Sequence, residues 1–237
     1  MDGGSHDSRV HRARVHRALG DVQRLAIVDE LWLSDRTPSE LAQLVGLSSN
    51  HLAFHLKVLA EAGVVVRTPS AGDARRRYVK LTGAFDASAS PRSIVAGSPL
   101  FICTRNSARS RLAAAMWESR TGLPARSAGH RPAGQVHPQA VTIARRRGLD
   151  LGSGRPCGYG AIKGPPPDLI VSVCDLANES DAPFEAPRVH WSMPDPVADP
   201  ARFSDVVDEL DRRIDRLAMS AGHLTAPRSE PADGARS

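Results

Sequence analysis

One stretch of the sequence, PLFICTRNSARSRLAAAMW at residues 99–117, constrains the fold more than any other. Its apolar start, Leu100–Ile102, predicts the end of a buried strand, and its Ala-, Leu- and Met-rich end predicts a helix that begins at Arg109. A strand that leads through a polar loop into a helix directs free backbone N–H groups and the positive end of the helix dipole at one place. We therefore expect an anion-binding loop with Cys103 as its first residue.

The residue types in this loop suit nucleophilic chemistry. A helix N-terminus and a nearby arginine both favour the thiolate form of a cysteine, which is the reactive form. Arg109 can present a planar fork of donors to a tetrahedral oxyanion, Ser110 can donate its hydroxyl to the sulfur, and Asn106 can brace the loop. The Cys-x5-Arg spacing is weak evidence by itself, and the predicted strand and helix on either side make it specific.

The form Cys-Thr-x-Asn-Ser-Ala-Arg-Ser resembles the phosphate loop of the low-molecular-weight protein tyrosine phosphatase family, and it is most similar to the arsenate reductase branch. The resemblance implies that Cys103 attacks phosphorus or arsenic and that an aspartate from later in the chain protonates the leaving group. It also implies that the loop holds the oxyanion through Thr104, Arg105, Asn106, Ser107, Ala108, Arg109 and Ser110.

After residue 98 the sequence alternates between strand and helix patterns, which predicts an α/β domain with a parallel sheet. Strands are expected at 125–129, 168–173 and 189–191, and helices at 137–147 and from Phe203 to Leu217. Ligands bind at the carboxyl ends of strands in such sheets. Cys103, Cys174 and Asp195 all follow predicted strands, so we expect them to lie at one edge.

Asp195 lies in the sequence HWSMPDP, between two prolines that fix the backbone of the loop. Such an aspartate can be a general acid or simply a turn residue. Two further segments, SAGHRPAGQVHP and CDLANE, resemble the same phosphatase family, and together with the Cys103 loop they favour the role of general acid.

Cys174 ends an apolar strand and can be either a small buried residue or a second reactive thiol. In the thioredoxin-coupled arsenate reductases a second cysteine at this place attacks the first, and a third cysteine, seven residues on, resolves the disulfide. Position 181 holds Asp181, so the resemblance leaves that last step without its cysteine. Cys157 or an external thiol (thioredoxin, mycoredoxin/mycothiol or similar) can replace it, and we expect no bound cofactor.

The first part of the chain predicts a helix-turn-helix. Thr37-Pro38-Ser39-Glu40 is a capping box with proline at the first helical position, for a helix over 39–45. Ser48 caps the next helix, over 49–62, after a turn at Gly46. A basic helix over 8–19 and a second helix precede this pair, residues 1–7 are expected to be irregular, and strands at 64–66 and 77–81 predict a hairpin wing.

About 70 residues, ALGDVQRLAIVDEL…PSELAQLVGLSSNHLAFHLKVLAEAGVV, resemble the winged-helix repressors of the ArsR type. The resemblance implies double-stranded DNA as a partner and a homodimer, although the usual final dimerisation helix is replaced by a predicted linker. It implies DNA contacts by Ser49, Asn50, His51 and Lys57 on the recognition helix and by Arg75, Arg76 and Arg77 on the wing.

A metal site is not expected. No cysteine precedes Cys103, so an arsenite-type thiolate site is absent from the first domain. His51 and His55 are four residues apart, a spacing that lets two histidines of a helix bind one metal ion. Both lie on the predicted recognition helix, however, where contact with DNA or packing is the simpler interpretation.

Composition narrows the class of protein. A net charge of +5 indicates an anionic partner, and an aromatic content of 4% argues against stacking platforms for single-stranded nucleic acid. The odd number of cysteines, three, indicates a reducing compartment, and no apolar run approaches a membrane span. We expect a cytoplasmic protein that does not bind membranes.

We therefore predict two domains: an N-terminal α+β winged helix at 8–82 and, after a linker at 83–97, a C-terminal α/β domain at 98–219. The second has a four-stranded parallel sheet of the flavodoxin-like, phosphotyrosine phosphatase I-like type, and 220–237 is a tail. The favoured function is a DNA-binding regulator fused to an arsenate reductase, because Val197 stands where phosphotyrosine enzymes of the family usually have an aromatic residue. A phosphotyrosine phosphatase and a non-catalytic oxyanion sensor are the alternatives.

Overall fold

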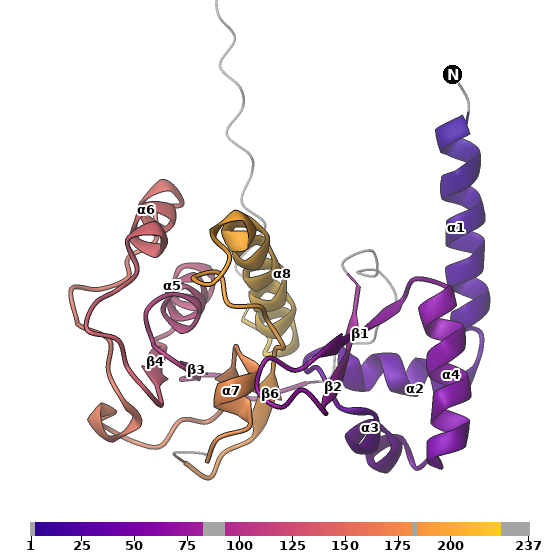
Figure 1. The fold of residues 1–237 in the computed structure, drawn as a ribbon, viewed down its shortest axis with the longest axis horizontal. Helices are drawn as coiled ribbons and strands as arrows, with labels where there is room; N and C mark the ends of the chain where they lie inside the picture. Colours follow the sequence, from indigo (N-terminus) through magenta and orange to yellow (C-terminus); the bar gives the residue numbers. More distant parts are fainter. Residues whose placement is uncertain (1–2, 83–92, 182–183, 224–237) are drawn as a thin grey trace, which may run out of the picture.

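The structure, a computed structural model, describes residues 3–82, 93–181 and 184–223. Figure 1 shows two lobes, with the first half of the chain in one and the second half in the other. Our predictions for residues 83–92 and 224–237 fall outside the described residues. No helix among the described residues is both long enough and apolar enough to cross a membrane.

The first lobe has the predicted winged helix-turn-helix architecture. It consists of α1 (Gly3–Leu19), α2 (Val22–Leu31), α3 (Pro38–Val45), α4 (Ser49–Glu61) and the antiparallel pair β1 (Val65–Pro69) and β2 (Arg77–Leu81). Thr37 and Glu40 form both bonds of the capping box, and Ser48 caps α4 by accepting from the N–H of His51. Between α3 and α4, Gly46 has a left-handed φ of 67°, which lets the chain turn tightly.

Two boundaries in this lobe differ from our predictions. The helix α1 begins at Gly3, so residues 3–7 are helical rather than irregular; extending an existing helix outward costs less than starting one. The strand β1 runs to Pro69 rather than ending at 66, because its pairing with β2 continues to the Pro69–Arg77 pair.

The second lobe has a four-stranded parallel sheet in the order β4-β3-β5-β6, which confirms the predicted fold class. Its strands are β3 (Leu100–Cys103), β4 (Arg126–Gly129), β5 (Ile170–Ser172) and β6 (Arg188–His190). The chain leaves β3 toward β4 on one side and returns to β5 on the other. The carboxyl ends of β3 and β5 therefore flank the topological switch point, where ligands bind in sheets of this kind.

The helices of this lobe are α5 (Arg109–Thr121), α6 (Pro138–Arg146), α7 (Asp175–Asn178) and α8 (Phe203–Ser220), with short 3-10 turns η1 (Tyr159–Ala161) and η2 (Pro200–Arg202). α5 packs on β3, β4 and α8. Trp117 of α5 and Leu210 of α8 are fully buried in the core. Residues 93–97, which we assigned to the linker, pack on this lobe: Ala96 is fully buried, and the N–H of Gly97 donates to Asp168 at 2.6 Å.

The two lobes are joined by backbone hydrogen bonds as well as by the chain. The segment 34–36 runs along β6, the edge strand of the parallel sheet, where the N–H of Asp35 donates to the carbonyl of His190 at 2.7 Å. On its other side Arg36 pairs with Val79 of β2 in an antiparallel bridge. This segment therefore links the wing to the edge of the second sheet, and Figure 1 shows β6 and α7 facing β2.

Candidate oxyanion site and DNA-binding face

The loop between β3 and α5 surrounds the sulfur of Cys103. The N–H of Asn106 donates to Cys103 Sγ at 3.2 Å, and Ser110 Oγ lies 3.1 Å from the same sulfur. Ala108, the residue before α5, makes no side-chain capping bond to the helix. The first-turn N–H groups of α5 are therefore left for an anion.

Asn106 holds the loop in this shape. It is fully buried and has a left-handed φ of 50°, a conformation that asparagine tolerates better than most residues. Its side-chain amide donates to Ser110 Oγ at 3.0 Å and to Ser127 Oγ at 2.9 Å. Its carbonyl oxygen accepts from the N–H of Cys157 at 3.0 Å.

Gly129, the last residue of β4, makes room for the loop. A Cβ atom at this position would lie 2.7 Å from the carbonyl oxygen of Thr104 and 2.8 Å from the nitrogen of Asn106. Both neighbours are backbone atoms of the loop, so they cannot rotate away. Glycine is required because the strand and the loop approach so closely.

Arg109 and Asp195 meet at the mouth of the loop. Arg109 Nη2 lies 3.4 Å from Asp195 Oδ1, and Arg109 Nη1 donates to the carbonyls of Met193 and Pro194 at 2.9 and 3.1 Å. The Arg109 side chain is 7% exposed, whereas that of Asp195 is 43% exposed. The guanidinium is thus fixed, and the carboxyl remains accessible to a bound anion.

Cys174 lies beside the same loop. Its Sγ is 3.4 Å from Thr104 Oγ1, and the residue is buried. Burial raises the pKa of the Cys174 thiol, and negative charge on Cys103 raises it further, while Arg109 and the hydroxyl of Thr104 act in the opposite direction. The four residues that we predicted to be catalytic, Cys103, Arg109, Cys174 and Asp195, therefore lie together at the carboxyl edge of the sheet.

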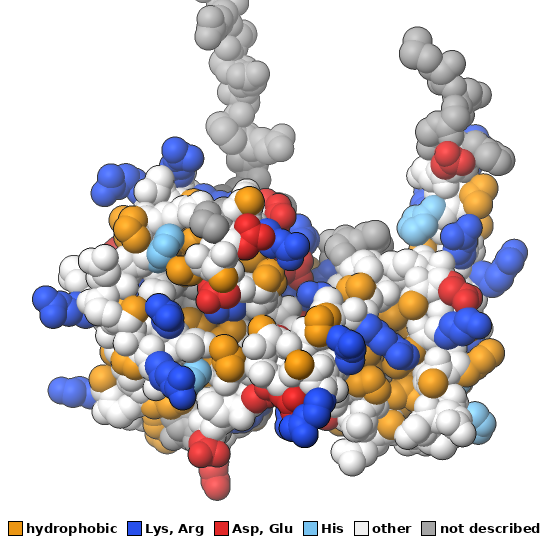
Figure 2. All heavy atoms as spheres, viewed as in Figure 1, with side chains coloured by type: hydrophobic (Ala, Val, Ile, Leu, Met, Phe, Trp, Pro, Cys, Tyr) orange, Lys and Arg blue, Asp and Glu red, His pale blue; other side chains and the backbone are white. Residues whose placement is uncertain are grey.

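The residues that we predicted to bind DNA are exposed. Ser49, Asn50, His51 and Lys57 lie on the exposed surface of α4. The wing arginines Arg75, Arg76 and Arg77 line a hollow of about 500 Å³ together with the N-terminal turn of α3. Figure 2 shows Lys and Arg side chains on both lobes of the face in view, several of them along α1.

The two histidines of α4 have different surroundings. His55 Nδ1 points toward Asp21, at 3.6 Å from Oδ1, whereas His51 is exposed. Within the described ranges no group of three or more His, Cys, Asp or Glu side chains is arranged to hold a metal ion.

Comparison with known proteins agrees with this geometry. The family model for low molecular weight phosphotyrosine protein phosphatases matches residues 99–226, more than half of the chain. The chain belongs to this family. A second model, for a helix-turn-helix domain, matches residues 19–68, so the chain is a fusion of a helix-turn-helix domain with a phosphatase-family domain, as the sequence predicted.

Three similar proteins illustrate the two halves. An arsenate reductase of Brevibacillus brevis is 32% identical over 123 residues, covering 50% of this chain and 91% of that protein. The uncharacterized HTH-type transcriptional regulator YceK of Bacillus subtilis is 35% identical over 72 residues, covering 30% of this chain and 69% of that protein. The crystal structure of an arsenate reductase from Archaeoglobus fulgidus is 28% identical, covers 51% of this chain and 98% of that chain, and has a TM-score of 0.47.

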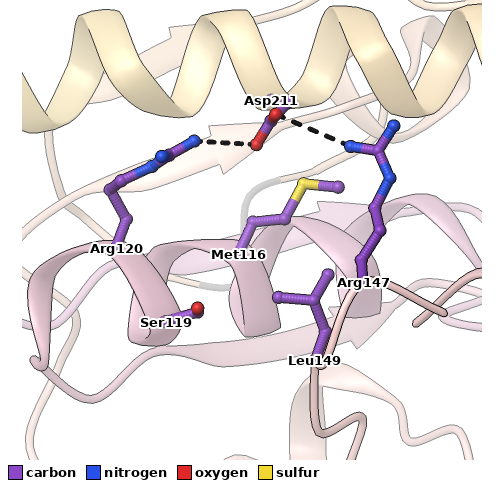
Figure 3. A pocket seen from close by; sticks show the side chains of 6 residues that line it. All are labelled: Met116, Ser119, Arg120, Arg147, Leu149 and Asp211. Atoms are coloured by element: carbon purple, nitrogen blue, oxygen red, sulfur yellow. Dashed lines mark hydrogen bonds and ion pairs between the residues drawn. The ribbon is translucent and has the colours of Figure 1, made fainter. Parts of the chain in front are cut away.

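A cavity of the phosphatase-family domain that lies away from the oxyanion loop has its arginines already paired. Figure 3 shows this space of about 300 Å³, lined by Met116, Ser119, Arg120, Arg147, Leu149 and Asp211. It contains two arginines, but Arg120 and Arg147 both pair with Asp211, at 2.9 and 3.5 Å. It also lies at the C-terminal end of α5, away from the N–H groups that face Cys103.

Several residues around the phosphatase-family site carried no signal in the sequence. Tyr159, in η1, has a buried hydroxyl. Burial raises the pKa of this hydroxyl most, and negative charge on Cys174 or Cys103 raises it further. Asp175 and His190 form a buried pair at 3.1 Å behind Cys174. A tyrosine in a glycine-rich loop and a histidine in a strand have no periodicity or spacing that reveals such contacts.

Proposed function

We propose that this protein is a DNA-binding transcriptional regulator whose phosphatase-family domain is a thiol-dependent arsenate reductase acting in arsenic resistance. The observation that carries the proposal is the position of Cys174, a second cysteine whose sulfur lies 3.4 Å from the hydroxyl of Thr104 in the oxyanion loop. A phosphatase needs only one reactive cysteine, whereas a reductase needs a second thiol. Val197, which follows Asp195-Pro196, offers no aromatic ring to stack on a phenol.

In the first step of the proposed reaction, Cys103 attacks arsenate held by the loop N–H groups and the guanidinium of Arg109. A bond forms between Cys103 Sγ and arsenic, and one As–O bond breaks. Asp195 donates a proton to the departing oxygen, which leaves as water. The accessible position of Asp195 at the mouth of the loop supports this role.

In the second step the thiolate of Cys174 attacks Cys103 Sγ. A disulfide forms, the S–As bond breaks, and its electron pair remains on arsenic, which is reduced from As(V) to As(III) and leaves as arsenite. Burial and negative charge on Cys103 raise the pKa of the Cys174 thiol, while Arg109 and the hydroxyl of Thr104 lower it. Arg109 and Thr104 therefore stabilise the Cys174 thiolate that this step needs.

The protein then needs an external thiol to restore the two cysteines. Asp181, where a resolving cysteine would stand in the relatives with three cysteines, is exposed and carries no sulfur. Cys157 donates its thiol to the carbonyl of Ser127 at 3.4 Å, on the β4 side of the loop. We therefore assign the last reduction to thioredoxin, mycoredoxin/mycothiol or a similar thiol of the cytoplasm.

For the first domain we propose binding to operator DNA as an ArsR-type homodimer. The exposed residues of α4 enter the major groove, and the wing arginines contact phosphates. The net charge of +5 is consistent with an anionic partner such as DNA.

The test is an arsenate-dependent assay in which the purified protein is coupled to a thioredoxin or mycoredoxin system and oxidation of the reductant is followed. We expect turnover that is abolished in Cys103→Ser and in Cys174→Ser, while Arg145→Lys, on the exposed side of α6, serves as the matched control. Turnover that persists in Cys174→Ser without an added small thiol would contradict the two-cysteine route.

A phosphatase activity is the second candidate, since the family match supports it directly. It predicts hydrolysis of p-nitrophenyl phosphate that needs Cys103 but is unaffected by Cys174→Ser. A protein that binds arsenate without either reaction, and whose DNA affinity then changes, is an oxyanion sensor.

A further inference from the structure

The short helix α7 connects the two proposed functions. It begins directly after Cys174, the residue whose sulfur touches the oxyanion loop through Thr104. Asp175, the first residue of α7, and Glu179, which follows its last residue, contact the first domain. Cys174, which contacts the oxyanion loop, and Asp175, which contacts the turn of the wing, are therefore consecutive residues.

Two carboxylates of this region hold the turn of the wing. Asp175, 2% exposed, accepts from the N–H of Ala71 at 2.8 Å through Oδ2, while its Oδ1 lies 3.1 Å from His190 Nε2. Glu179 accepts from Ser70 Oγ at 2.7 Å. A Cβ on Gly72 would lie 2.2 Å from Glu179 Oε2, which shows how closely the turn fits over this carboxylate.

A third contact enters the strand of the wing. Tyr78 of β2 is 1% exposed, and its hydroxyl accepts from the Asn178 side chain and donates to Glu179, both at 3.1 Å. Asn178 in turn accepts from Ser172 of β5 at 3.0 Å. Burial raises the pKa of Tyr78 to about 12, so the hydroxyl keeps its proton and these bonds persist at physiological pH.

The wing arginines come immediately after this anchored turn. Arg75, Arg76 and Arg77 follow Ser70–Asp73 after one residue, Ala74, and are exposed. The position of Ser70 and Ala71 on α7 therefore sets where the arginines lie relative to α4. Because the contacts are hydrogen bonds to one buried carboxylate, Asp175, and one partly buried carboxylate, Glu179, they weaken steeply when α7 is displaced.

We propose that the thiol state of the oxyanion site controls DNA binding: a disulfide between Cys103 and Cys174 displaces α7, releases the turn of the wing and weakens the affinity for operator DNA. The proposal deepens the function proposed above, which supplies arsenate as the oxidant. Two thiols are oxidised to one disulfide while As(V) is reduced to As(III), so the electrons balance.

The geometry gives the direction of the effect. The register of β3 and β5 pairs Ile102 with Ser172, so Cys174 lies one residue beyond the position opposite Cys103. A disulfide needs its two sulfurs about 2.05 Å apart. Cys174 Sγ is in contact with Thr104 Oγ1 in the dithiol form, and in the proposed disulfide form it leaves that contact and the start of α7 moves with it. Asp175, the next residue, then loses its hydrogen bond with the N–H of Ala71 or its contact with His190 Nε2.

The experiment measures the affinity of the full-length protein for a fluorescent duplex containing the promoter upstream of its own gene, by anisotropy at fixed salt. One sample is reduced with dithiothreitol and desalted, and the other is oxidised with diamide, which takes two hydrogens from a thiol pair. Peptide mass spectrometry identifies the disulfide. We expect the oxidised protein to bind about fivefold or more weakly, with recovery after re-reduction.

Three variants separate this coupling from a general effect of oxidation. Cys174→Ser should bind DNA with the same affinity before and after diamide, and Cys157→Ser should still respond as the wild type does. Tyr78→Phe keeps the ring but loses both hydrogen bonds of the hydroxyl. The difference in DNA affinity between the reduced and the oxidised form of this variant should therefore be smaller than in the wild type.

Equal affinities of the two thiol states of the wild type would overturn the proposal, and so would a diamide effect that survives in Cys174→Ser or failure of the Cys103–Cys174 disulfide to form. Diamide does not depend on arsenate chemistry. A diamide-dependent shift in a protein that does not reduce arsenate would therefore reject the reductase function and leave the coupling intact.

Discussion

Arg109 Nη2 lies 3.4 Å from Asp195 Oδ1, while Nη1 of the same guanidinium donates to the carbonyls of Met193 and Pro194 in the loop that carries Asp195. A single buried side chain therefore connects the oxyanion loop to the proposed acid. Binding of the anion and presentation of the proton both depend on the planar fork of this arginine, which a lysine does not have.

We expect Arg109→Lys to lower kcat/KM for arsenate by about 100-fold or more, the usual cost of removing one preorganised oxyanion donor. The measurement is the coupled reductase assay, with far-UV circular dichroism to establish that the variant folds. Arg145→Lys, an exposed arginine on α6, should keep the wild-type rate. A Lys variant with wild-type kcat/KM would show that Arg109 only supports the structure.

Gly129→Ala should disturb the oxyanion loop because the new methyl group would lie 2.7 Å from the carbonyl oxygen of Thr104. We expect the free energy of unfolding to fall by about 1–3 kcal/mol, as for other overpacked sites, together with a loss of turnover. Urea unfolding and the reductase assay measure the two effects. Gly134→Ala is the matched control, because its Cβ would meet nothing within 4 Å. Equal behaviour of the two variants would refute the close-approach argument.

Release of arsenite should become faster as the pH rises. Burial raises the pKa of Cys174, so its thiol is protonated at neutral pH, and the reacting thiolate increases roughly tenfold per pH unit below that pKa. Single-turnover arsenite release between about pH 6 and pH 8 measures this slope. In Cys174→Ser with an added small thiol, the dependence should instead follow the pKa of that thiol. A pH-independent rate in the wild type would mean that ionisation of Cys174 does not limit the step.

The interface between the lobes contains a buried ion pair, in which Arg213 Nη1 lies 3.0 Å from Asp35 Oδ1. The Oδ2 atom of Asp35 also accepts from the N–H of Ser192 at 2.7 Å. Asp35→Ala leaves the buried guanidinium paired with Glu209 at 2.6 Å and removes the acceptor of the Ser192 N–H, so we expect the free energy of unfolding to fall by about 1–3 kcal/mol in urea denaturation. The exposed pair Asp199–Arg202 is the control, since Asp199→Ala should change the free energy of unfolding by at most about 1 kcal/mol. A small effect of Asp35→Ala would indicate that water enters the interface.

The double variant Arg75→Ala/Arg76→Ala should weaken binding to all DNA sequences alike, because both side chains are exposed on the wing and are proposed to contact phosphates. We expect the slope of log affinity against log salt concentration to decrease by about 2, one for each phosphate that the wing no longer neutralises. Anisotropy titrations at several salt concentrations measure it, with Arg145→Ala/Arg146→Ala as a control of equal charge. An unchanged slope would mean that the wing does not bind the DNA backbone.

Local patterns in the sequence predicted the strands and longer helices of both lobes and their order, but not the short helix α7 or the turns η1 and η2. The capping box at Thr37 and Glu40, the turn at Gly46 and the apolar strands on either side of Cys103 each depend on residues near one another in the chain. The predicted placement of Cys103, Cys174 and Asp195 at one edge followed from the parallel topology alone, since parallel strands end on the same side of a sheet.

What the chain by itself determined, then, was the order of its elements, the loop around Cys103 and the edge where its partners meet. The tertiary structure decided what lies behind that edge: the closeness of Gly129 to the loop, the hold of Arg109 on the acid loop, and the contact of α7 with the turn of the wing. Asp175 and Ala71 are 104 positions apart, and no periodicity or motif connects them. Their contact exists because segment 34–36 docks the wing against β6, and such a fit depends on shape and on paired backbone groups that a linear pattern does not record.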